Sequence, residues 1–149
     1  MRTRKFYIAL ILGFYLLFNV AQAQTAQEFT AESHIKANTP ESADIDTFMV
    51  RDLEAYFADL IGKIVKVKYE FLRDGPTQTG TAYPKFYLWV RLTNKNKPVQ
   101  EGAVRVAAIE KKRFEVTHFM SATEIIKNPE SVYGVFPRPV CDKIKAKIK

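Results

Sequence analysis

The spacing of apolar residues changes at Gly62 from a helical period to an extended one, and this change limits the folds open to the chain. From Asp44 to Ile61, apolar residues recur at steps of three and four, with charged residues on the opposite side. After Gly62 they alternate with polar residues. The sequence therefore predicts one long amphipathic helix followed by strands. Ser42 or Asp44 is the expected N-cap and Gly62 the expected C-cap.

Alternating segments follow the helix, and each ends at residues that favour turns. They comprise residues 65–71, 85–92, 104–109 and 114–120, the third beginning after Gly102. Short connections between neighbouring strands favour antiparallel pairing, because a parallel pair needs a crossover of about a dozen residues or more. We therefore expect a four-stranded antiparallel meander.

The C-terminal part predicts short helices. Ser121 and Glu124 have the spacing of a capping box, so a helix should continue through Lys127 and stop at Asn128-Pro129. The tail from Cys141 to Lys149 fits helical and extended spacing equally well. Its lysine and alanine content, with Pro139 suited to a first turn, favours a helix.

The predicted fold class is α+β: one long N-terminal helix packed on a four-stranded antiparallel meander sheet, with short C-terminal helices. This single domain spans residues 44–149. Residues 24–43 are polar and poor in large apolar side chains, which predicts a flexible arm with one short strand at Phe29–Ile35.

Residues 1–23 have the three parts of a secretory signal peptide. Basic residues 2–5 precede the uncharged apolar run 6–20, and Ala21-Gln22-Ala23 supplies small residues for cleavage after Ala23. A membrane anchor is the alternative, but a span needs about 20 apolar residues, and this run is shorter and contains Asn19. We expect an exported protein, periplasmic or secreted, that begins at Gln24.

The charges of the mature chain are unevenly distributed. Residues 24–60 hold eight acidic and two basic residues, whereas residues 61–149 hold eight acidic and eighteen basic ones. The basic part, including the lysine-rich C-terminal tail, could contact an anionic envelope surface. A solvated lysine surface is the simpler interpretation, because the lysines alternate with apolar residues as on a half-buried strand. Nucleic acid is not an expected partner of an exported protein.

The sequence contains few residues for metal or covalent chemistry. One cysteine, Cys141, and two histidines exclude an internal disulfide and a four-ligand zinc site within one chain. Phosphate-loop, nucleophile-elbow and two-histidine metal motifs are absent from the sequence, so no catalytic residue, metal or cofactor is assigned. Cys141 is interpreted as a packing residue, with an activated nucleophile or an intermolecular disulfide as alternatives.

The alternation also predicts a second apolar face of the sheet. If residues such as Phe86, Leu88 and Val104 pack under the helix, the neighbouring side chains must point to the other side. These predicted contact residues are Tyr87, Trp89, Arg91, Arg105, Ile109 and Phe119. Tyr, Trp and Arg are enriched at protein contacts. The alternative is that the C-terminal helices cover this face.

One long helix before four antiparallel strands resembles the architecture of the cystatin-like and NTF2-like α+β families, whose curved sheet wraps the helix. Residues 78–83 (QTGTAY) are similar to the glutamine-and-glycine hairpin loop of cystatins. The middle of that motif is not matched and no Pro-Trp pair follows, so protease inhibition is not implied. NTF2-like enzymes place acid/base residues inside the concavity of the sheet.

Two functions follow as hypotheses. The first is a non-enzymatic exported binding protein that uses the outer sheet face for a protein partner or for self-association. The second is a small cavity enzyme of NTF2-like type, acting on a small molecule, with His118 as base and Tyr69 or Tyr83 as proton donor. His118 is expected on the same strand face as Phe114 and Val116, where burial would shift its pKa. A core histidine is the simpler interpretation of His118.

Overall fold

The computed structural model describes residues 28–148, and the predicted leader and its cleavage position lie outside them. After a helical segment at residues 28–38, the elements are α2 (Ser42–Ile61), β1 (Lys66–Phe71), β2 (Lys85–Asn94), β3 (Lys97–Ile109), β4 (Arg113–Ser121), α3 (Ala122–Lys127), the 3₁₀ helix η1 (Pro129–Gly134) and α4 (Arg138–Lys147). The predicted α+β class is confirmed. Within the described residues, no helix combines the length and the apolar character that crossing a bilayer requires.

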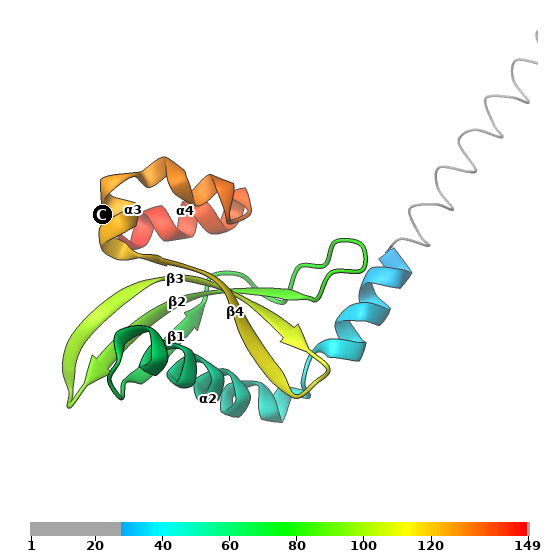
Figure 1. Cartoon of the computed structure of the whole chain (residues 1–149). Helices are drawn as coiled ribbons and strands as arrows, with labels where there is room; N and C mark the ends of the chain where they lie inside the picture. Colours follow the sequence, from blue (N-terminus) through cyan, green and yellow to red (C-terminus); the bar gives the residue numbers. More distant parts are fainter. Residues whose placement is uncertain (1–27, 149) are drawn as a thin grey trace, which may run out of the picture.

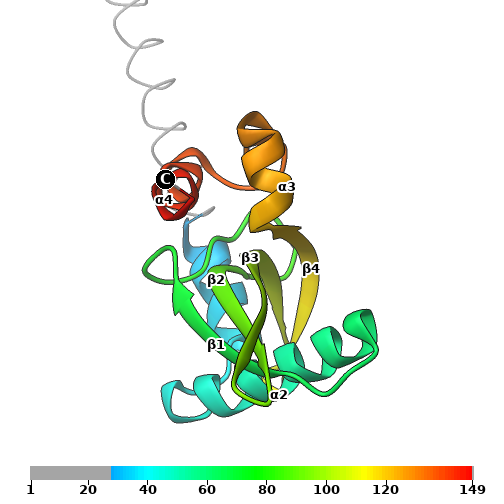
Figure 2. The same ribbon diagram turned by 90° about the vertical axis from the view of Figure 1, so that its left-hand side faces the viewer.

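The strands form one antiparallel sheet in the order β1-β2-β3-β4, which confirms the predicted meander. Helix α2 lies against one face of this sheet, and α3, η1 and α4 lie against the other (Figure 1). A view turned by 90° gives the same layering (Figure 2). The sheet is therefore enclosed between helices, and each face has its own apolar core. The inner core faces α2, and the outer core faces α3, η1 and α4.

The inner core lies between α2 and the sheet. Met49, Leu53 and Phe57 are fully buried on the helix and pack against the inward side chains of all four strands. Gly62 has a φ of 70° and its N–H donates to the Ala58 carbonyl, as predicted for the C-cap. The N-cap is Glu41, without a side-chain hydrogen bond, so the predicted cap at Ser42 or Asp44 is wrong.

The segment before α2 is helical, so the strand predicted at Phe29–Ile35 is wrong. Glu, Ala and Lys in this segment favour a helix. Its C-terminal end is fixed to the β3–β4 turn, because the Asn38 carbonyl accepts from the Lys111 N–H at 2.8 Å. Lys111 also forms an ion pair with Glu41 at 3.0 Å.

Two tight turns join the last three strands. Lys95 and Asn96 between β2 and β3 have φ values of 47° and 64°, and Glu110 and Lys111 between β3 and β4 have values of 50° and 58°. Two left-handed residues in succession match the twist of an antiparallel hairpin. Strand β3 therefore begins directly after the first turn, at Lys97, and not after Gly102 as expected from the sequence.

A bulge in β4 exchanges its two faces. Arg105 pairs with His118 but Val106 pairs with Val116, which leaves Thr117 as an extra residue. The Thr117 hydroxyl donates to the Arg105 carbonyl and accepts from the Arg105 guanidinium, each at 3.0 Å. Beyond the bulge, Phe119 packs in the inner core, and His118 is exposed. The predicted outer position of Phe119 and the predicted burial of His118 are therefore wrong.

The C-terminal helices follow the sequence prediction. The Ser121 hydroxyl accepts from the Glu124 N–H at 3.2 Å, and the Ser121 N–H donates to the Glu124 carboxylate at 2.8 Å, which completes the capping box. Helix α4 confirms the helical choice for the tail, with Val140, Cys141 and Ile144 buried against the sheet.

Candidate binding surface

The outer sheet face is the side opposite α2, and its centre is covered by the C-terminal helices. Tyr87 and Trp89 point to this side, as predicted, but only 5% and 2% of their surfaces are exposed. They pack with residues of α3, η1 and α4, and the rings of Tyr87 and Phe136 lie 6.2 Å apart. Of the two alternatives stated for this face, coverage by the C-terminal helices is therefore confirmed at Tyr87 and Trp89, and an open aromatic surface there is wrong.

Three other predicted contact residues are also engaged within the chain. Arg105 is half-buried and its guanidinium donates to the Val135 carbonyl at 3.0 Å, which fastens the C-terminal helices to the sheet. Ile109 is buried at the end of β3. Phe119 lies in the inner core, with its ring 4.9 Å from that of Phe57.

Arg91 is the predicted contact residue that remains exposed, and it lies in a row of charged side chains. We define the charged strip as Lys68 and Glu70 of β1, Arg91 of β2 and Glu101 of β3, all exposed. The Arg91 Nε lies 3.4 Å from a Glu101 carboxylate oxygen, and the same oxygen accepts from the Trp89 Nε1 at 3.3 Å.

The strand register brings these side chains together. Lys68 is opposite Arg91 and Arg91 is opposite Glu101, while Glu70 is opposite Trp89. Directly opposed residues on one face of an antiparallel sheet are close enough for their side chains to interact. The strip therefore crosses three strands at the point where the helical cover ends.

A depression of about 230 Å³ lies over this part of the sheet. It is lined by Lys68, Tyr69, Glu70, Trp89 and Arg91. The Trp89 indole therefore lines this depression together with the cationic side chains Lys68 and Arg91 and the carboxylate of Glu70. Glu70 also forms an ion pair with Lys147 of α4, which ties the last turn of that helix to the border of the strip.

Two residues of the enzyme hypothesis, His118 and Tyr69, lie far apart in the sheet. His118 is on β4 and Tyr69 is on β1, which are the two edge strands of the sheet. The Tyr69 hydroxyl donates to the Asp46 carboxylate at 2.9 Å, and burial together with this hydrogen bond raises the pKa of the phenol. Tyr83 is 42% exposed. The structure therefore does not bring His118 and Tyr69 together as a base and a proton donor.

Cys141 is a buried thiol in the outer core. Its sulfur lies 3.2 Å from the Phe136 carbonyl oxygen and 3.5 Å from that of Val132. Burial raises the pKa of the Cys141 thiol, which disfavours the reactive thiolate. Within residues 28–148, no group of three or more His, Cys, Asp or Glu side chains is arranged to hold a metal ion.

Two lysines of the C-terminal tail, Lys145 and Lys147, interact with their own chain. Lys145 binds the Glu130 carboxylate at 2.7 Å and lies 4.4 Å from the centre of the Tyr133 ring. Lys147 pairs with Glu70. These ammonium groups are already partnered, so the tail offers less free positive charge than its composition indicates.

Sequence reasoning missed Lys68, Glu70 and Glu101 as members of the surface. Lys68 and Glu70 lie on the polar side of an alternating segment. Alternation indicates on which face of the sheet a side chain lies, but it does not indicate which side chains of other strands lie next to it. Glu101 lies before Gly102, in a part of β3 that the sequence did not assign to a strand.

Comparison of the chain with protein-family models, with curated proteins and with solved structures gives no match.

Proposed function

We propose that the protein is an exported, non-enzymatic interaction protein that self-associates through the charged strip. The observation that carries this proposal is the junction at Glu101, where one carboxylate oxygen contacts both the exposed Arg91 and the buried Trp89 indole. An exposed charge network anchored on a buried aromatic ring is held in place by the core, so little side-chain freedom is lost on binding.

The distribution of charge supports a second copy of the chain as the partner. The strip contains two cationic side chains, Lys68 and Arg91, and two anionic ones, Glu70 and Glu101. A symmetric dimer contacts itself through one surface, so that surface must be complementary to itself. A strip with both signs meets this condition, because Arg91 of one copy can face Glu101 of the other in both directions.

Export is proposed from residues 1–23, which have the organisation of a cleavable leader. We also propose that the chain is related to the cystatin-like and NTF2-like families. The order of its elements, one long helix followed by a four-stranded meander, supports this relationship. In this proposal the fold presents a binding surface and does not form an active-site cavity.

Cell fractionation of the full chain tests export. We expect the protein outside the cytoplasm, with an intact mass that begins at Gln24. Replacing Ala21 and Ala23 by Leu should block cleavage and leave the longer chain. Cytoplasmic protein with an intact N-terminus would contradict this part of the proposal.

Sedimentation equilibrium of the mature protein tests self-association. We expect a dimer that weakens with added salt and with Arg91→Glu. The matched control is Arg113→Glu, which reverses an exposed arginine of β4 with the same change in net charge. A wild-type protein that stays monomeric at all concentrations would contradict the proposal.

A further inference from the structure

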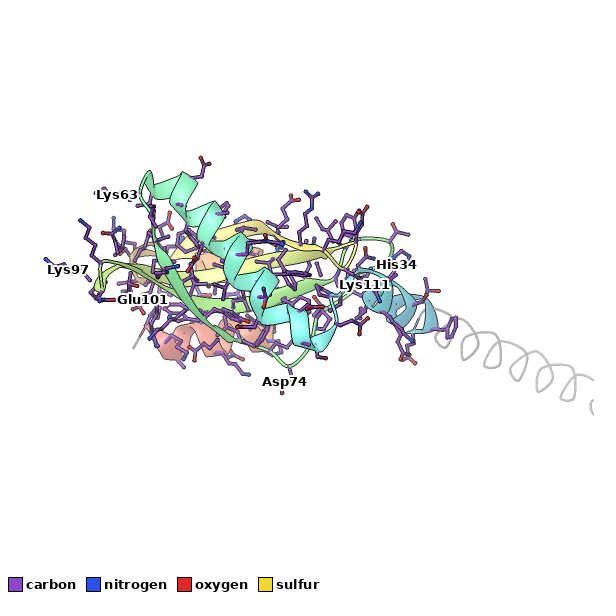
Figure 3. All side chains as sticks on the ribbon, turned by 90° about the horizontal axis from the view of Figure 1, so that it is seen from below. His34, Lys63, Asp74, Lys97, Glu101 and Lys111 are labelled. Atoms are coloured by element: carbon purple, nitrogen blue, oxygen red, sulfur yellow. The ribbon has the colours of Figure 1, made fainter. Side chains whose placement is uncertain are left out.

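Basic side chains gather at the end of the molecule formed by the α2–β1 loop and the β2–β3 turn. We define the lysine tip as Lys63, Ile64, Lys95 and Lys97. Lys63 and Lys97 lie at the same end, and His34 and Lys111 lie at the opposite end (Figure 3). The lysine tip is thus separate from the helical segment and from the β3–β4 turn.

The backbone of the lysine tip is fixed by hydrogen bonds. Lys66 at the start of β1 pairs with Thr93 near the end of β2, which brings the two connections side by side. The Asn94 side-chain amide donates to the Ile64 carbonyl and locks the loop to the hairpin. The left-handed turn at Lys95 and Asn96 then places Lys97 directly after it. The side chains of the lysine tip therefore project from a preformed base.

The positive charge of the lysine tip is not neutralised by ion pairs. Among the described residues, Lys63, Lys95 and Lys97 form no salt bridge. Lys66, by contrast, is paired with Glu54 at 3.1 Å. The nearest acidic side chains in sequence are Asp59, four residues before Lys63, and Glu101, four residues after Lys97. Asp59 makes no ion pair with Lys63, and Glu101, which lies at the same end of the molecule (Figure 3), pairs with Arg91. The free ammonium groups thus leave an excess of positive charge.

An apolar side chain protrudes among these ammonium groups. Ile64 is 81% exposed, the most of the large apolar residues in the described chain, and it borders a groove of about 580 Å³. The groove is lined by Lys63, Ile64, Val65, Lys66, Thr93, Asn94 and Lys95. Leu60, in the last turn of α2, is also more than half exposed. Neither core of the protein uses Ile64.

We infer that the lysine tip docks on an anionic phospholipid surface, with Ile64 entering the headgroup region and Lys63, Lys95 and Lys97 meeting lipid phosphates. Lysine near an anionic membrane gains attraction from the surface potential, and an apolar side chain gains from leaving water at the same interface. A soluble acidic chain would use the lysines but would not require Ile64. The lysine tip shares no residue with the charged strip, although Glu101 of the strip lies at the same end of the molecule (Figure 3).

Co-sedimentation with vesicles tests the inference. The probes are phosphatidylcholine vesicles and vesicles of phosphatidylcholine with an equal amount of phosphatidylglycerol. We expect binding to the second kind only, weakened by salt. Each lysine removed by Lys63→Gln, Lys95→Gln or Lys97→Gln should lower the affinity by roughly fivefold.

The matched control removes three exposed lysines at the other end of the molecule: Lys36→Gln, Lys111→Gln and Lys112→Gln. Its net charge equals that of the triple variant of the lysine tip, so any difference reports position and not total charge. Equal loss of vesicle binding in both triple variants would overturn the inference. All six positions are exposed, and circular dichroism checks that the fold is kept.

Ile64 distinguishes a bilayer from a soluble polyanion. In Ile64→Trp, the emission of the new indole should shift to the blue on mixing with the anionic vesicles, while the single native tryptophan is already buried. Ile64→Gln should weaken vesicle binding several-fold. Binding to polyglutamate as strong as to the vesicles, with no effect of Ile64→Gln on either, would overturn the lipid assignment.

Discussion

The indole Nε1 of Trp89 and the guanidinium Nε of Arg91 contact the same carboxylate oxygen of Glu101, at 3.3 and 3.4 Å. Trp89 is part of the outer core, whereas Arg91 and Glu101 are exposed. Glu101 therefore links the packed outer core under the C-terminal helices to the charged side chains at the surface. Because Trp89 is buried, a substitution there is expected to lower the stability of the fold more than it changes the surface available for binding.

Trp89→Ala should destabilise the protein by about 3–5 kcal/mol, because it removes a large fully buried ring beneath α4 and leaves a cavity. Trp89→Phe keeps most of the packing and should cost clearly less. Urea unfolding monitored by circular dichroism measures both. Wild-type stability of Trp89→Ala would show that the outer core does not depend on this ring.

Gly102→Ala should destabilise the fold, because β3 and β4 approach closely at this position. An added Cβ would overlap the Met120 carbonyl oxygen and lie 2.8 Å from the Phe119 ring. Overpacking of this kind costs about 1–3 kcal/mol. Gly134→Ala is the control, since its Cβ meets nothing within 4 Å. Equal midpoints of thermal unfolding for the two variants would contradict the close approach.

The capping box of α3 predicts a pH-dependent contribution to stability. The backbone N–H and the hydroxyl of Ser121 hold the pKa of Glu124 below its usual value of 4.5. A carboxylate with a lowered pKa stabilises the folded state above its unfolded pKa, and this contribution is lost as the pH falls through the folded value. Glu124→Gln should therefore unfold more easily than wild type near neutral pH.

Urea unfolding of both proteins between acidic and neutral pH checks this prediction. The stability difference between wild type and Glu124→Gln should shrink as the pH falls below the unfolded pKa of the carboxyl group. A difference that stays constant over the whole range would show that the Glu124 charge does not contribute.

Cys141 should be unreactive in the native protein, because its thiol is buried and its pKa is raised. Ellman's reagent should label it only after unfolding, and the mature protein should show no disulfide-linked dimer on a non-reducing gel. Rapid labelling without denaturant would mean that α4 opens readily. It would also restore the intermolecular disulfide as an alternative.

The period of apolar residues was sufficient to predict the elements but not every side-chain direction. Alternation placed Tyr87 and Trp89 on the correct side because β2 is regular through them. It failed at His118 and Phe119, since the extra residue Thr117 reverses the faces and its anchor, Arg105, lies twelve positions earlier. A bulge of this kind depends on the partner strand, which local periodicity does not report.

The charged strip likewise could not be predicted from local sequence, because its side chains are brought together by the pairing of three strands. Arg91 was predicted as a contact residue from its face alone, but Lys68 and Glu101 join it only through the register of three strands. The cover over Trp89 is formed by helices more than thirty positions away in the chain. The sequence predicted both the face and the helices, but whether the helices cover the face depends on tertiary packing.

A charge exchange across the charged strip tests the proposed self-association most directly. Arg91→Glu and Glu101→Arg each place like charges opposite one another in a symmetric dimer, so each variant alone should sediment as a monomer. An equimolar mixture restores opposite charges in both directions and should sediment as a mixed dimer. If both variants dimerise like wild type, or if the mixture stays monomeric, the charged strip is not the surface through which the protein associates.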